Sequence, residues 1–480
     1  MAHEHLYYFV VCWISTSIAM MSTFFMTPAK IPSSGEQLSN AQLARVRESL
    51  RKLRIKYFFV YAFASLGDWC QSVYLIRLLE KYGYSTNHIR TCFVIGFLSS
   101  AFLGTLAASL ADRFGRKRLA RCYFALSAAS CVCVHNRAMW SIILSRVLGG
   151  VAMSLLMSTF ESWFVQAHNE FHSGWLNESF SFQSFTNAST GILAVLFSEI
   201  LADKTKPTYG PDVQTFSFSY GGSVAPFAVS FFVLLIGAGI VSYAWDEVPA
   251  AVPSTYATSK YCGYEIVRGV RTGMKRWDMV LLCMCVSALD SAWFIWFVTW
   301  KPAMEQEHNP PSQFVFVALM SGYMVGSQIF RLLVQCMRVE TIATVVFFVS
   351  SVSIALSVWL PTGHARFACF YAFLTSVGTW RVVASSLKSS IVEESMRTTV
   401  YSLFDVPSNL VVAFVLLNCL SIETTLVTCA VILVAGGVSS CFLRQQRVST
   451  HMSATLVMAT GSRNHTRASE NERPLLVSSV

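Results

Sequence analysis

The chain has 480 residues, of which 54% are hydrophobic and only 13% are charged. Soluble domains usually carry about 25% charged residues, so this composition and a mean hydropathy of +0.50 exclude an ordinary soluble protein. The formal net charge of +10 does not indicate nucleic-acid binding, because the Lys and Arg residues stand in loops between apolar stretches rather than on one soluble domain.

The first apolar stretch runs from about Leu6 to Met26 and is long enough to cross a bilayer. No Lys or Arg precedes it, and it is longer than the core of a signal peptide. We therefore expect residues 1–26 to form an extra N-terminal transmembrane helix whose N-terminus lies outside the cytoplasm. A cleaved signal peptide is the alternative.

Residues 27–56 form a basic segment with an apolar stripe at spacings of three and four: Leu43, Val46, Leu50 and Leu53. Six basic residues supply its polar side: Arg45, Arg47, Arg51, Lys52, Arg54 and Lys56. This pattern predicts an amphipathic helix on the anionic cytoplasmic surface of the membrane. A plain linker helix is the alternative.

Twelve further apolar stretches follow, near 57–80, 88–111, 120–136, 139–163, 180–202, 222–244, 277–302, 313–335, 340–361, 366–388, 399–419 and 422–443. The longest gap divides them six and six. We therefore expect a six-helix bundle over 57–244, a cytoplasmic central loop over 245–276 and a second six-helix bundle over 277–443. The polar tail, 444–480, is expected to be disordered and cytoplasmic.

The basic loops set the expected topology. Lys and Arg are rich in 27–56, 112–121, 245–276 and the tail, and such loops are held on the cytoplasmic side. The fold class is therefore all-α, a polytopic membrane protein of thirteen spans. Three Asn-x-Ser/Thr sequons, at Asn177, Asn187 and Asn464, fall in cytoplasmic or membrane positions and are expected to carry no glycan.

Charged residues lie inside the predicted spans: Asp68, Arg77, Arg146, Glu161, Asp290, Arg331, Arg381 and Asp405. A charge at the bilayer centre costs about 2.5–3.5 kcal/mol on insertion scales. Such residues therefore line a water-filled path or pair with one another. Solute contact and purely structural ion pairs both remain open.

The depth of each charged residue within its predicted span indicates its role. Asp68 and Asp290 are nearest the middle, which favours solute contact or proton binding, whereas Arg77 and Arg331 are near span ends and are expected to extend to the headgroups. Arg381 and Asp405 both lie about 10 Å from the cytoplasmic end of neighbouring spans. We therefore predict a salt bridge between Arg381 and Asp405.

The sequence gives little support for metal binding, nucleotide binding or catalysis. The fourteen Cys residues are scattered without the spacing of a zinc site, and no phosphate-binding loop of the Walker type is present. We expect no metal and no cofactor. Glu161 and His168 alone would suggest acid–base chemistry, but an enzyme is not the favoured interpretation.

Two motifs indicate a family. The run Ala111-Asp-Arg-Phe-Gly-Arg-Lys-Arg118 resembles the loop between helices two and three of major facilitator superfamily transporters. Arg146-Val-Leu-Gly-Gly150 resembles the fourth-helix signature of the same superfamily. The resemblance implies gating roles for Asp112, Arg113, Gly115 and Arg116, and a coupling role for Arg146.

Further segments are similar to the molybdate-anion transporter family within that superfamily: Gly67-Asp-Trp-Cys-Gln-Ser-Val-Tyr74, Phe160-Glu-Ser-Trp-Phe164 and Phe404-Asp-Val-Pro-Ser-Asn409. The resemblance implies a secondary transporter of a small oxyanion such as molybdate, moved with protons in a lipid bilayer. It adds Trp69, Gln71 and Tyr74 to the expected pathway, beside Asp68, Glu161 and Asp290. The plasma membrane is the expected location, with an endomembrane as the alternative.

The chain departs from the family at two charged positions. Asp405 stands where the family has Arg, and Arg381 stands where an aromatic residue is usual. Exchanging Arg for Asp near a central cavity weakens the attraction for an anion, unless Arg381 replaces the lost charge. A membrane receptor or scaffold that no longer transports is therefore the second hypothesis.

Overall fold

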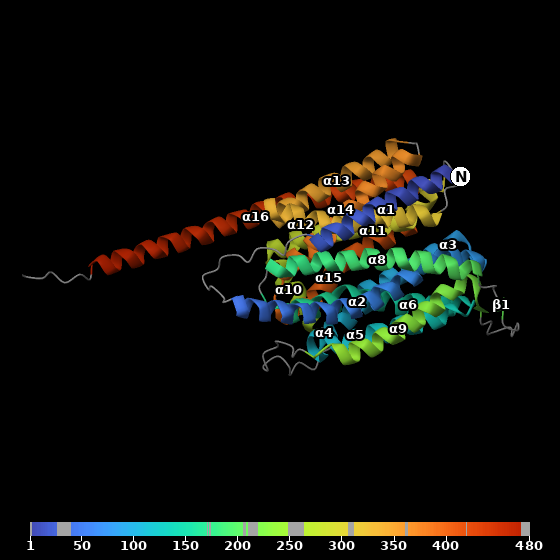
Figure 1. Ribbon diagram of the computed structural model, residues 1–480, viewed down its shortest axis with the longest axis horizontal. Coiled ribbons are helices and arrows are strands. Elements are labelled where there is room, and N and C mark those ends of the chain that lie inside the picture. The colour runs from blue at the N-terminus through green and yellow to red at the C-terminus, as the bar shows by residue number, and fades with distance from the viewer. Residues whose placement is uncertain are drawn as a thin grey trace, which may run out of the picture.

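The computed structural model (Figure 1) describes residues 2–25, 40–169, 171, 174–204, 208–209, 219–247, 264–305, 312–360, 363–418 and 420–471. Nearly all of these residues are helical. The strands among them are β1 (Thr208–Tyr209) and β2 (Ser219–Tyr220), which pair antiparallel between two helices. The fold is therefore all-α, as predicted.

The first half of the bundle holds six units. They are α2 (Asn40–Lys81); α3 (Thr86–Ser99), the π-helical η1 (Ser100–Gly104) and α4 (Thr105–Phe114); α5 (Arg116–Val134); α6 (Met139–Leu155), the π-helical η2 (Leu156–Phe160) and α7 (Glu161–His168); α8 (Gly174–Lys204); and η3 (Gly222–Val224) with α9 (Ala225–Ala244). The π-helical turns interrupt two of these units without ending them. Such turns are often found at functional sites.

The second half also holds six units. They are α11 (Trp277–Glu305), α12 (Ser312–Cys336), α13 (Val339–Trp359), α14 (Gly363–Ile391), η4 (Glu394–Met396) with α15 (Arg397–Leu417), and α16 (Ile422–Asn471). A short helix, α10 (Tyr264–Lys275), precedes them, and α1 (Ala2–Phe25) precedes the first half. The six-and-six division expected from the loop lengths is present.

Ten helical stretches of the described residues are long and apolar enough to cross a membrane. The other three expected spans are the helices α1, α2 and α5, which lie alongside the rest in Figure 1. Polar side chains interrupt the apolar runs of α2 and α5, and the apolar part of α1 that is described, Tyr7–Met20, is short. The protein is an integral multi-pass membrane protein.

The two halves meet along two seams. On one seam α8 packs against α12 and α14, and on the other α3, η1 and α4 pack against α15. Within the second half, α12 and α14 touch through their backbones, because a Cβ atom added at Gly326 would lie 1.9 Å from the carbonyl oxygen of Thr375. Only glycine permits so close an approach of two membrane helices.

The extra N-terminal helix α1 packs on the second half rather than on the first. The ring of Tyr7 stacks on His364 at 5.3 Å, and the Ser15 hydroxyl lies 2.6 Å from that of Tyr371. Its N-terminus lies at the end of the bundle opposite the start of α2 (Figure 1). We refer to the end that carries the basic segments 40–56 and 113–118 as the cytoplasmic end, and to the opposite end as the outer end.

Three segments differ from the sequence expectation. The basic segment and the first span form one continuous helix, α2, because no Gly or Pro occurs between Asn40 and Gly67; residues 26–39 lie outside the described residues. The central loop contains the helix α10. The last helix continues past the expected end at 443 to Asn471, because Ala, Gln and Arg residues continue it, so residues 444–471 are helical where an irregular tail was expected.

Candidate functional site

Five charged side chains from the two halves gather near the interface between the halves. Asp290 Oδ1 lies 3.6 Å from Arg381 Nη1, and Glu161 Oε2 lies 3.1 Å from Lys388 Nζ. Asp405 interacts electrostatically with all four of these groups. We call these residues the central charge cluster. It contains three carboxylates and two cations, so one carboxylate has no counter-charge within it.

The predicted salt bridge between Arg381 and Asp405 is wrong. Arg381 pairs instead with Asp290, which extends from α11. The prediction rested on the equal depth of Arg381 and Asp405 in the membrane. Depth alone does not decide a pairing, because the rotation of each helix determines which side chains face each other. Among the described residues, no three His, Cys, Asp or Glu side chains are grouped to hold a metal ion.

Local helix geometry positions the cluster. Glu161 follows directly on the π-helical turn η2, whose extra residue rotates the helix that continues beyond it. Lys388 lies 4.6 Å from the centre of the Tyr401 ring, whose face attracts a cation. Glu161 and Lys388 come from different halves, so their ion pair crosses the interface between them.

Asp68 and Arg146 lie apart from the central charge cluster. They interact electrostatically with each other, and Arg146 also with Cys92 and Cys131, all in the first half. No ion pair within 4 Å joins them, and Arg146 donates a hydrogen bond to the hydroxyl of Ser145 at 3.1 Å. The predicted pathway residues therefore form two groups rather than one.

Four aromatic side chains close the space between the cluster and the outer end. Trp69 from the first half makes edge contacts with Trp293, Phe297 and Phe316 of the second half, at centroid distances of 6.5, 6.0 and 6.1 Å. Its indole nitrogen donates a hydrogen bond to Asn187. We call these four residues the aromatic floor. Gln71, one turn C-terminal to Gly67, instead bonds to Ser127 inside the first half.

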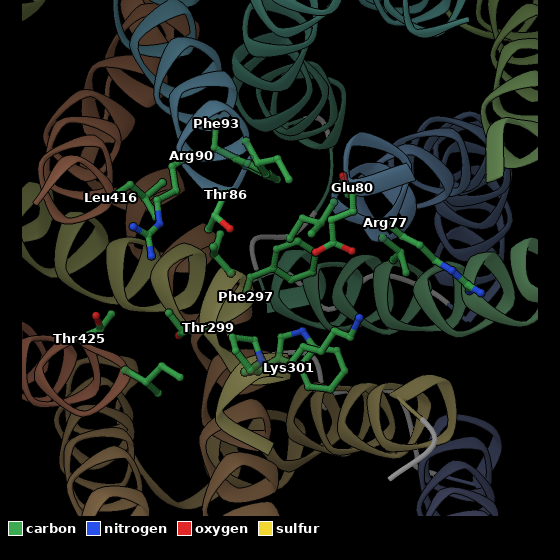
Figure 2. Close-up of a pocket in the computed structure, with 18 of the residues that line it drawn as sticks. Arg77, Glu80, Thr86, Arg90, Phe93, Phe297, Thr299, Lys301, Leu416 and Thr425 are labelled. Atoms are coloured by element: carbon green, nitrogen blue, oxygen red, sulfur yellow. The ribbon is translucent and has the colours of Figure 1, made fainter. Parts of the chain in front are cut away.

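A cavity of about 630 Å³ opens above the aromatic floor at the outer end. Its wall includes Phe297 and Phe316 of the floor and Tyr74 from α2. Three cationic residues, Arg77, Arg90 and Lys301, and one acidic residue, Glu80, also line it. Figure 2 shows Arg90, Glu80 and Lys301 around a common space, whereas Arg77 points away from them.

Arg77 and Arg331 do not extend to the headgroups as expected, because each has a carboxylate partner. Arg77 Nη1 lies 3.2 Å from Glu199 Oε2, which also accepts a hydrogen bond from Tyr74. Arg331 Nη2 lies 3.5 Å from Glu178 Oε1, and Arg54 lies 3.0 Å from the other oxygen of that carboxylate. Arg54 therefore faces the protein rather than the lipid surface expected for its segment.

The superfamily motif closes the cytoplasmic end. Asp112, at the end of α4, accepts hydrogen bonds from the backbone N–H groups of Thr398 and Thr399 at 3.3 and 2.8 Å, and from the Thr399 hydroxyl at 2.8 Å. These groups belong to the first turn of α15, where the helix dipole favours a negative charge. A carboxylate of the first half thus caps a helix of the second half. We call this contact the α15 cap.

Arg116 strengthens the α15 cap. Its guanidinium is buried, lies 3.3 Å from Asp112, and donates to the Thr398 hydroxyl and to the carbonyl of Glu394 in the second half. Gly115 alone joins α4 to α5. Its φ of +103° is a backbone angle that favours glycine. Arg113 is exposed and lies against its neighbour Phe114, so the motif's residues do not all serve the contact.

Two residues of this site escaped the sequence analysis. Lys388 lies at the expected end of its span, where a cation is ordinary, but α14 continues to Ile391 and the Lys388 side chain is only partly exposed beside Glu161. Glu178 falls just before the expected start of a span at 180, and α8 begins earlier, at Gly174. In both cases an error of a few residues in a boundary concealed an intramembrane charge.

These features define a class. Two six-helix halves that are joined at the cytoplasmic end and separated by a cavity at the outer end, with charges paired across their interface, are the architecture of a secondary transporter of the major facilitator type. Alternating access in this class moves the halves about a site between them.

Comparisons with known proteins identify the family. A family model described as sugar transporters with twelve transmembrane helices matches residues 37–365, which is more than half of the chain, so the chain belongs to this family of major facilitator transporters. The molybdate-anion transporter of Xenopus tropicalis is 25% identical over 380 residues, covering 77% of this chain and 79% of that protein. That of Takifugu rubripes is 25% identical over 403 residues, covering 78% and 81%.

A solved structure shares the fold. A proton:xylose symporter of the major facilitator superfamily, bound to 6-bromo-6-deoxy-D-glucose, superposes with a TM-score of 0.62. The match covers 82% of this chain and 95% of that one at 13% identity. At this identity the likeness concerns the fold alone.

Removing the Asp112 carboxylate is expected to loosen the first turn of α15. An Asp112→Ala substitution removes a cap of about 1 kcal/mol, so the amides of Thr398 and Thr399 should exchange hydrogen roughly fivefold faster, as measured by mass spectrometry. Arg113→Ala is the matched control, because Arg113 is adjacent and exposed. Equal exchange in the Asp112→Ala protein and the wild type would mean that the cap is absent.

Charge reversal distinguishes the two possible partners of Arg381. Arg381→Asp leaves two buried carboxylates facing each other and should lower the yield of folded protein in size-exclusion chromatography severalfold. Adding Asp290→Arg should restore part of that yield, whereas adding Asp405→Arg should restore less. If Asp405→Arg restored the yield of the Arg381→Asp protein and Asp290→Arg did not, the pairing of Arg381 with Asp290 would be contradicted.

Proposed function

We propose that the protein carries a small oxyanion, with molybdate as the first candidate, across the membrane by alternating access together with protons. The observation that carries the proposal is the outer cavity, which Arg90 and Lys301 line together with Phe297 and Phe316 of the aromatic floor. The molybdate-anion transporters at about 25% identity support the same substrate class. Cations at the mouth of a low-dielectric cleft raise the local concentration of an anion.

The transport cycle would begin from the state described above. The α15 cap and the ion pairs of Glu178 hold the cytoplasmic end closed, while the outer cavity admits the solute. Passage requires Trp69 to separate from Phe297 and Phe316, which then exposes the central charge cluster. Rocking of the halves breaks the cytoplasmic contacts and releases the solute.

A charged substrate suits this pathway better than a neutral sugar, despite the description of the family. A sugar site needs neutral hydrogen-bonding groups, whereas Arg381 and Lys388 stand between the halves. In a site from which water is excluded, a cation attracts an anion strongly. Arg381 adds a cation to this site at a position where the related family usually has an aromatic residue.

Proton coupling follows from the surplus carboxylate. Asp405 interacts electrostatically with Asp290 on α11, with Arg381 and Lys388 on α14, and with Glu161 on α7. With all five groups ionised, the cluster carries one net negative charge. An anion that enters such a site is repelled until a carboxylate is protonated. We therefore propose that Asp405 binds the proton that enters with the anion.

Purified protein in liposomes should take up radiolabelled molybdate with saturation. Sulfate should compete and xylose should not. The double substitution Arg90→Gln with Lys301→Thr should raise KM roughly three- to tenfold with little change in kcat, because it weakens attraction at the cavity mouth. Lys81→Gln, at an exposed site of the outer end, is the control. Uptake of xylose without uptake of any oxyanion would reject the proposal.

Replacing Asp405 tests whether this carboxylate binds the proton that enters with the anion. In the wild type, uptake should fall as the outside pH rises, because the carboxylate must be protonated before the anion can stay. Asp405→Asn mimics the protonated state, so its uptake should vary little with pH and should no longer accumulate anion against a gradient when an inward proton gradient is imposed. An unchanged pH profile in Asp405→Asn, with saturable uptake retained, would refute the role of Asp405 but not oxyanion transport.

A further inference from the structure

The helix α10 lies where the central loop meets the membrane. It ends at Lys275, and only Arg276 separates it from Trp277, the first residue of the membrane-crossing α11. One face packs against α15: a Cβ at Gly269 would lie 3.1 Å from the side chain of Leu403 and 3.5 Å from that of Thr399. This face therefore touches the same turn of α15 that Asp112 caps.

The opposite face of α10 is apolar and has no partner among the described residues. Val267, Val270 and Met274 recur at spacings of three and four and are 66%, 41% and 75% exposed, so they form one stripe. Trp277, at the start of α11, is also apolar and is 61% exposed. Arg271 and Lys275, four residues apart and both exposed, lie along one edge of this stripe. The helix thus has an inner face on the protein, an apolar outer face and a basic edge.

We propose that the outer face of α10 lies in the cytoplasmic leaflet, with Val267, Val270 and Met274 at the level of the acyl chains and Arg271 and Lys275 on anionic lipid headgroups. A helix with an apolar face beside a basic edge binds the membrane interface in this way, and cytoplasmic leaflets are anionic. The position of α10 also supports lipid as its partner. The chain leads directly from this helix into α11, whose exposed apolar residues Trp277 and Met284 lie on a membrane-crossing helix.

Lipid binding at α10 would stabilise the α15 cap. Because the inner face of α10 contacts Thr399 and Leu403, holding the helix against the leaflet also holds the first turn of α15 in place for Asp112. Arg268 adds to this contact through the hydroxyl of Ser395, at 3.5 Å. Anionic lipid is therefore inferred to stabilise the closed cytoplasmic end, whatever solute the protein carries.

Hydrogen exchange on the full chain in nanodiscs tests the proposal. Amides of 264–275 should exchange about fivefold more slowly in phosphatidylcholine with added phosphatidylserine than in phosphatidylcholine alone. The double substitution Arg271→Glu with Lys275→Glu should abolish this difference. Lys81→Glu, a charge reversal at an exposed site of the outer end, should leave the difference intact.

Two results would contradict binding of anionic lipid to the basic edge of α10. One is identical exchange of 264–275 in the two lipid compositions. The other is a lipid effect that persists in the Arg271→Glu, Lys275→Glu protein, which would place the lipid contact elsewhere. A Val267→Asn, Met274→Asn protein separates the apolar contribution: its exchange should be faster than the wild type in both lipids, and an unchanged rate would also contradict the burial of the stripe. None of these readouts depends on transport.

Discussion

The cost of a charge in a medium of low dielectric constant governs this molecule. An ionised side chain inside a membrane helix is costly without a partner, and three of the partnerships here cross between the two halves. Lys388 pairs with Glu161, Arg331 with Glu178, and the Asp112 carboxylate with backbone N–H groups of α15. The charges that make the interface polar are therefore the same groups that hold it together.

The two ends of the interface are closed by different chemistry. At the cytoplasmic end, directional hydrogen bonds and ion pairs join α4 to α15 and α8 to α12. Toward the outer end, the aromatic rings of Trp69, Trp293 and Phe297 touch at their edges. Directional bonds either form or break, whereas ring contacts shift gradually and adapt to a passing solute.

The sequence predicted the helix number and the six-and-six division because hydrophobic runs and charge bias are local signals. It failed where the answer depended on helix rotation, as for Arg381, whose partner is Asp290. It failed also where a boundary was displaced by a few residues, as for Lys388. The π-helical turn before Glu161 has no sequence signature, yet it determines the direction in which that carboxylate points.

The docking of α1 on the second half has a mechanical consequence. Tyr7 and Ser15 bind this helix to α14, while the chain continues from Phe25 into α2 of the first half at Asn40. The segment 26–39 thus tethers two bodies that must tilt against each other. Fourteen residues span at most about 50 Å when fully extended, so Phe25 and Asn40 cannot move further apart than roughly this distance during the transport cycle.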